Sequence, residues 1–143
     1  MDKNFVASVI AISIASLMLG FVVHGVFLHD AYAKLPNLFR PETQAQGYFG
    51  YMLIAHLLIG TGFTWIYRRG REDKPWLIQG FRFGAAVAVM MTIPTYLIYF
   101  AVQPLPSDLV AQQIVFDLIA ILLLGIFVAW LNKYPAQETI KRV

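Results

Sequence analysis

Long apolar stretches alternate with short polar segments along most of the chain. The stretches are Phe5–Leu28, Tyr48–Tyr67, Phe83–Val102 and Leu109–Leu131. A helix needs roughly 20 predominantly apolar residues to cross the hydrocarbon core of a bilayer, and each stretch meets or nearly meets that length. Backbone polar groups must be paired inside lipid, so the stretches are expected to be helical. The pattern predicts an all-α integral membrane protein, a four-helix up-down-up-down bundle in a single transmembrane domain over residues 1–143.

The polar segments predict how the four helices are connected. Residues 29–47 form the longest connection, an outer loop in which Leu35, Leu38 and Phe39 are apolar, and residues 68–82 form a cytoplasmic loop. Pro94 lies inside the third stretch, where it removes a backbone donor and predicts a kink. Thr92 or Thr95 is placed to bond a carbonyl freed there.

Composition supports a membrane location independently of the apolar stretches. Hydrophobic residues make up 59% of the chain, the mean hydropathy is +0.64, and charged residues make up only 13%. A soluble domain carries about 25% charged residues. Cysteine is absent, which excludes disulfides, thiolate metal sites, iron–sulfur ligation and covalent c-type haem attachment.

The distribution of basic residues predicts an orientation. If the four helices alternate in direction, only Lys34 and Arg40 fall on one side. The other nine Lys and Arg residues share the opposite side: Lys3, Arg68, Arg69, Arg71, Lys74, Arg82, Lys133, Lys141 and Arg142. The positive-inside rule then places both termini and the 68–82 loop in the cytoplasm, in a multi-pass protein of the cell inner (plasma) membrane. The basic residues behind the net charge of +3 thus determine the topology and lie near anionic lipid headgroups. Nucleic-acid binding is not expected.

Small and polar residues recur at steps of three and four within every stretch. Such steps keep side chains on one face of a helix. In lipid that face turns toward other helices, because small residues permit close packing and polar residues need partners. The faces predicted to form the bundle interior are Ser13, Ser16, Gly20 and His24; His56, Gly60 and Thr64; Gly84, Ala88, Thr92 and Tyr96; and Gln113, Asp117, Ala120 and Leu124.

Ionisable residues in these faces lie at a similar depth. With a rise of about 1.5 Å per residue, His24, His56 and Asp117 fall within roughly 5–13 Å of the outer boundary. An ionised carboxylate at a helix centre costs about 2.5–3.5 kcal/mol on insertion scales, which favours a paired or neutral Asp117. The same layer holds the hydrogen-bonding side chains of Tyr96, Tyr99 and Gln113.

Three interpretations of this polar layer stay open. The first is a structural hydrogen-bonded network around Asp117 that fixes the helix register. The second is a cofactor site, in which His24 and His56 are axial ligands of a b-type haem or join Asp117 around a metal ion. The third is a proton-coupled carrier centred on Asp117.

Three short motifs carry a resemblance to a known class of proteins. They are Gly20-Phe21-Val22-Val23-His24-Gly25, Gly80-Phe81-Arg82-Phe83-Gly84 and Pro104-Leu105-Pro106. With the overall pattern, they make most of the chain resemble small bacterial four-helix inner-membrane proteins. The resemblance implies a fold and a location, but such proteins have no settled activity to carry over.

The sequence favours a non-enzymatic accessory or assembly subunit of a larger membrane complex. It contains no catalytic constellation, no soluble domain and no polar path through the membrane, and its 29–47 loop offers apolar residues for docking. The expected partners are the lipid bilayer and larger membrane proteins, or further copies of the chain. A haem- or metal-binding protein using His24 and His56, and a carrier around Asp117, are the alternatives.

Overall fold

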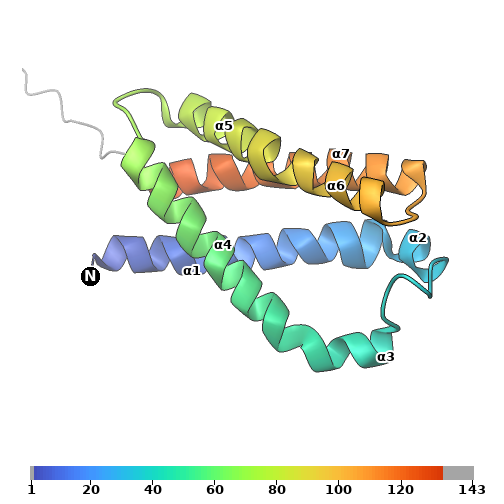
Figure 1. Cartoon of the computed structure of the whole chain (residues 1–143). Coiled ribbons are helices and arrows are strands. Elements are labelled where there is room, and N and C mark those ends of the chain that lie inside the picture. Colours follow the sequence, from blue (N-terminus) through green and yellow to red (C-terminus); the bar gives the residue numbers. More distant parts are fainter. Residues whose placement is uncertain (1, 134–143) are drawn as a thin grey trace, which may run out of the picture.

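The computed structural model describes residues 2–133, and every regular element among them is a helix (Figure 1). The elements are α1 (Lys3–Gly20), the π-helical η1 (Phe21–Phe27), α2 (His29–Ala33), α3 (Glu42–Ala45), the 3-10 turn η2 (Gln46–Tyr48), α4 (Phe49–Gly70), α5 (Trp76–Val87), the π-helical η3 (Ala88–Thr92), α6 (Ile93–Val102) and α7 (Ser107–Leu131). Four helical segments are long and apolar enough to cross a membrane: Lys3–Phe27, Thr43–Gly70, Trp76–Val102 and Ser107–Leu131. The prediction of an all-α chain with four membrane-length helices is confirmed. Lys141 and Arg142, which entered the charge argument, lie outside the described residues.

Two boundaries differ from those expected. The third span begins at Trp76 instead of Phe83, because Pro75 is the N-cap of the helix and no further proline interrupts it before Phe83. The segment 29–47 is not a simple loop, since it contains α2 and α3. Leu28, which is fully buried, joins η1 to α2 and anchors this segment.

The four spans form two antiparallel pairs. α1 packs mainly on α4, and α5 packs on α7, while α1 also contacts α7 and so joins the pairs. Figure 1 shows α4 crossing α1 obliquely, so that its N-terminal half and α3 diverge from the other spans. The buried residues of α4 are accordingly all in its C-terminal half: Gly60, Phe63, Thr64 and Tyr67.

Glycine allows the helices of each pair to touch through their backbones. A Cβ atom at Gly60 would lie 2.1 Å from the Ser13 hydroxyl oxygen and 2.7 Å from the carbonyl oxygen of Val9. In the other pair, a Cβ atom at Gly125 would lie 2.5 Å from the carbonyl oxygen of Gly80. The hydrophobic effect does not drive helices together in lipid, so close contact of this kind supplies the packing energy.

Seven basic residues gather at one end of the four spans, which we name the basic end (Figure 1). They are Lys3, Arg68, Arg69, Arg71, Lys74, Arg82 and Lys133. Arg68 donates to the Asp2 carboxylate at 2.5 Å, and Arg71 donates to the carbonyl oxygen of Asn132 at 2.6 Å. These bonds tie the end of α4 to the start of α1 and to the end of α7. We name the opposite end, which holds α2 and the turn between α6 and α7, the far end.

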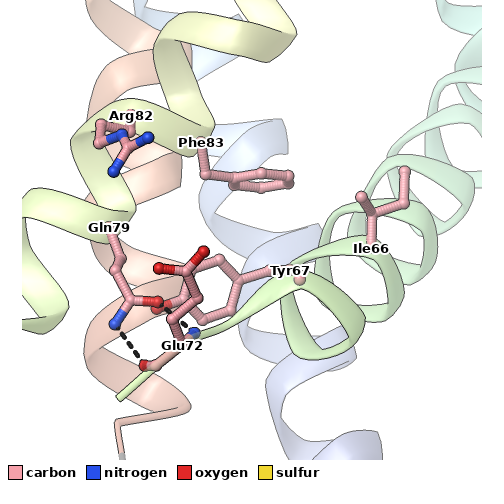
Figure 2. Close-up of a pocket in the computed structure, with 7 residues that line it drawn as sticks. Ile66, Tyr67, Glu72, Gln79, Arg82 and Phe83 are labelled. Carbon is pink, nitrogen blue, oxygen red and sulfur yellow. Dashed lines mark hydrogen bonds between the residues drawn. The ribbon is translucent and has the colours of Figure 1, made fainter. Parts of the chain in front are cut away.

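The turn between α4 and α5 is closed by one side chain. The amide nitrogen of Gln79 donates to the carbonyl oxygens of Glu72, at 2.7 Å, and of Lys74, at 2.6 Å. The amide oxygen of Gln79 accepts from the backbone N–H of Glu72 at 2.7 Å (Figure 2). Phe83 of α5 also meets Phe63 and Tyr67 of α4 at ring-centroid distances of 5.0 and 5.5 Å. α4 is therefore well fixed at the basic end.

The contact at Gly60 predicts a matched pair of substitutions. Gly60→Ala should destabilise the protein by about 1–3 kcal/mol, since the methyl group forces the backbones of α1 and α4 apart. Gly62→Ala is the control, because a Cβ atom there meets nothing within 4 Å; it should be neutral or stabilising by up to about 1 kcal/mol through helix propensity. Thermal unfolding in detergent measures both. Equal effects at the two positions would contradict the close contact.

The ion pair at Asp2 predicts a pH-dependent contribution to stability. The Arg68 guanidinium beside Asp2 holds the pKa of that carboxyl below its ordinary value. The resulting stabilisation is complete above the unfolded-state pKa and is lost as the pH falls through the folded-state pKa. Asp2→Asn keeps a capping oxygen for α1 and removes the charge. Its melting temperature should fall slightly below that of the wild type near neutral pH, and the two should converge in acid and at high salt. A difference that is constant with pH would exclude this ion pair as its cause.

Candidate functional site

Five side chains form a hydrogen-bonded group near the far end, which we name the polar network. The Tyr32 hydroxyl lies 2.6 Å from His24 Nδ1 and accepts a bond of 3.1 Å from the Gln113 amide nitrogen. His24 Nε2 lies 3.3 Å from Asp117 Oδ2. Tyr96 donates its hydroxyl to the same carboxylate oxygen. The network thus connects η1, α2, α6 and α7.

The polar network has one consistent arrangement of protons when His24 is neutral. Because Gln113 donates to the Tyr32 oxygen, the Tyr32 hydroxyl is free to donate to His24 Nδ1. The His24 proton then sits on Nε2, from which it points at Asp117. Tyr96 donates as well, so the hydrogen bonds of the polar network all run toward the Asp117 carboxylate. Charge-assisted bonds of this kind satisfy a carboxylate that lipid alone would not.

A π-helical turn places His24 in the network. The backbone N–H of Leu28 donates to the carbonyl oxygen of Val23 at 2.9 Å, a span of five residues that widens the end of α1. The chain then continues into α2, where the backbone N–H of Tyr32 donates to the carbonyl oxygen of Leu28 at 3.0 Å. Tyr32 returns over η1, and its ring stacks on that of His24 with the centroids 6.0 Å apart.

A second π-helical turn precedes Tyr96. The segment η3 ends at Thr92, two residues before Pro94, which has no backbone N–H to donate. The Thr95 hydroxyl donates to the carbonyl oxygen of Met91 at 2.5 Å. The sequence predicts a kink at Pro94 with Thr92 or Thr95 bonding a freed carbonyl. The structure shows a π-helical segment just before Pro94, and it is Thr95 that bonds a nearby carbonyl. Tyr96 follows immediately and faces α7.

Burial differs across the network. Gln113 is only 5% exposed, and its side-chain oxygen has no hydrogen-bond partner within residues 2–133. Burial also raises the pKa of Tyr32, so its hydroxyl keeps its proton at any physiological pH. By contrast, the side chain of His24 is 37% exposed and that of Asp117 is 17% exposed. The side of the polar network formed by His24 and Asp117 is therefore more exposed than the side formed by Gln113.

His56 does not join the polar network. Its Nδ1 atom lies 2.9 Å from the Ser16 hydroxyl oxygen, and its ring covers Gly20, where a Cβ atom would lie 3.4 Å from His56 Cε1. Within residues 2–133, no three His, Cys, Asp or Glu side chains are grouped so as to hold a metal ion. The structure therefore brings together His24 and Asp117 of the predicted metal set, but not His56.

The interpretation of His24 and His56 as axial haem ligands stays a prediction. A histidine ligand needs a ring nitrogen with a free lone pair. Both ring nitrogens of His24 already have partners, Tyr32 and Asp117. Ligation through either nitrogen of His24 would require one of these two contacts to open.

Tyr99 lies outside the polar network in which it was expected, whereas Tyr32, which was not expected there, belongs to it. Tyr99 was expected in the network, but it is 46% exposed and its hydroxyl bonds to none of the five network side chains. Tyr32 was not expected there, because it follows the apolar stretch and was placed in a loop. Its position eight residues after His24, close to two helical turns, is the signal that would have placed it on the same face.

No family model, curated protein or solved structure matches this chain. The resemblance to small bacterial four-helix inner-membrane proteins therefore stays a prediction. The four membrane-length helices agree with the fold that this resemblance implies.

The polar network predicts that loss of the Tyr32 hydroxyl destabilises the protein more than loss of the Tyr99 hydroxyl. Tyr32→Phe removes the partner of both His24 and Gln113, and unmet buried polar groups cost about 1–3 kcal/mol. Tyr99→Phe is the control, and should change stability by less than about 0.5 kcal/mol. Unfolding in mixed micelles by added sodium dodecyl sulfate measures both variants. If Tyr99→Phe were as damaging as Tyr32→Phe, the central place of Tyr32 would be refuted.

Proposed function

We propose that this chain is a non-enzymatic accessory or assembly subunit of a larger membrane complex, and that α4 is its docking helix. The observation that carries the proposal is the exposure of α4. Between residues 49 and 59, every residue except His56 is exposed, on all sides of the helix. No other span has so long an exposed segment. The N-terminal half of α4 therefore packs little against other helices within residues 2–133.

Lipid alone tolerates such a helix, but a protein partner adds to its stability. Helices in a bilayer gain from van der Waals packing and interhelical hydrogen bonds, which lipid chains supply less well. The exposed half of α4 offers bulky side chains on every side, including Tyr51, Ile54 and Leu58, which are 72%, 58% and 66% exposed. A partner helix lying against this half would complete packing that α1 supplies only as far as His56.

The same proposal includes an orientation. The basic end carries seven Lys and Arg residues, whereas the far end carries Lys34 and Arg40. This asymmetry supports a cytoplasmic basic end in a protein of the cell inner (plasma) membrane, with the polar network near the outer face. The network then holds the far ends of α1, α6 and α7 together while α4 stays free to bind.

One observation favours a second candidate function, a proton-coupled carrier around Asp117. Asp117 contacts a partly exposed His24, and a paired histidine and carboxylate can exchange protons with solutes that reach them. A core cluster lies between the network and the basic end, in which Ile12 and Val128 are fully buried and Leu124 is 3% exposed. This apolar layer favours a one-sided site over a continuous path, so the accessory role is the better supported.

Photocrosslinking in native membranes tests the docking proposal. A photoreactive amino acid at Leu58 should give adducts with a different membrane protein. The same residue at Val89 of η3 is the matched control, since it is equally apolar and 67% exposed but lies on the α5–α7 pair; it should label lipid. Lipid adducts alone at both positions would refute the proposal, as would adducts in which Leu58 reaches only a second copy of this chain.

A further inference from the structure

A pocket at the basic end lies beside the start of α1 and the end of α4. Its volume is about 400 Å³, and it is lined by Asp2, Phe5, Trp65, Arg68, Arg69 and Arg71. Three guanidinium groups and one carboxylate give it a positive balance. We propose that this pocket binds the phosphate headgroup of an anionic phospholipid from the adjacent leaflet, which we name the headgroup pocket.

Arg68 is held in place before any ligand arrives. Its Nη2 atom donates to Asp2 at 2.5 Å, and its guanidinium carbon lies 5.6 Å from the ring centroid of Phe5. Its Nη1 atom is buried and has no hydrogen-bond partner in the part of the chain that the structure describes. A buried donor without an acceptor is costly, and phosphate oxygens accept strong charge-assisted hydrogen bonds from arginine. The side chain as a whole is 24% exposed and lines the pocket.

Arg69 and Trp65 match the depth at which lipid phosphates lie. The guanidinium carbon of Arg69 lies 5.6 Å from the Trp65 ring centroid, and Trp65 is 54% exposed. Exposed tryptophan marks the level at which headgroups meet acyl chains. Arg69 follows one helical turn later, toward the phosphate layer, and Arg71 is oriented by its bond to the Asn132 carbonyl oxygen. The pocket thus combines an apolar wall with fixed cations, as a bound lipid requires and a free phosphate does not.

A second pocket at the basic end differs from the headgroup pocket in charge and serves as its control. It has a volume of about 260 Å³ and contains Glu72, Gln79 and Arg82, with aromatic and apolar walls (Figure 2). Its single arginine is balanced by Glu72, which is itself paired with Lys74. Arg82 therefore resembles Arg69 in charge and location at the membrane boundary, but it does not belong to a cluster of cations.

Lipid retention by the purified full chain tests the proposal. Native mass spectrometry in detergent should show phosphatidylglycerol retained over phosphatidylcholine. A basic residue near a membrane surface contributes about 1 kcal/mol, so Arg69→Gln should weaken that retention about fivefold. Arg82→Gln removes the same charge from the same end and should change retention less than about twofold. Arg69 makes no hydrogen bond within residues 2–133 that the variant would break, and a melting curve checks that each variant is folded.

Three results would overturn the headgroup pocket. Equal losses in Arg69→Gln and Arg82→Gln would mean general electrostatic attraction. Equal retention of the anionic and zwitterionic lipids by the wild type would mean no headgroup selectivity. Displacement of phosphatidylglycerol by inorganic phosphate at millimolar concentration would assign the pocket to free phosphate.

Discussion

Close backbone contact at a few glycines is the constraint on which the rest of this structure depends. Gly60 lets α4 meet α1, and the glycines of α5 and α7 bring those helices together in the same way. In lipid there is little hydrophobic gain from joining two apolar helices, so short interhelical distances must supply the attraction. The positions of these glycines also decide where contact ends. Beyond Gly60, α4 has no comparable contact and diverges from α1.

Hydrogen bonds replace glycine contact at the far end. His24, Tyr32, Tyr96 and Gln113 surround Asp117 directly or through one another, and they come from separate helical segments. Two π-helical turns make this arrangement possible, because each changes the direction in which the following side chains project. The protein therefore uses packing at one end and polar bonding at the other, and α4 takes part only in the first.

Sequence reasoning located the spans and part of the network, and its errors have physical causes. Counting residues along a helix estimates the level of a side chain, and the structure brings Gln113, Asp117 and Tyr96 into one hydrogen-bonded group. Depth does not give direction. His56 faces Ser16 of α1, where α4 crosses that helix obliquely, while Tyr99 turns outward. Tyr32 was missed because the apolar pattern ends at Leu28, although the helical path turns and continues.

The side chain of Gln79 has a mechanical consequence for α4. By closing the turn at Glu72 and Lys74, it fixes one end of a helix whose other half is free. Tyr67 lies near the fixed end of α4, and about 27 Å of helix separates it from Phe49. A tilt of α4 by about 10° at Tyr67 would move Phe49 by roughly 5 Å, a distance comparable to one helical turn. A change in the tilt of α4 at the basic end would therefore displace Phe49 more than Gly60, which lies closer to Tyr67 and against α1.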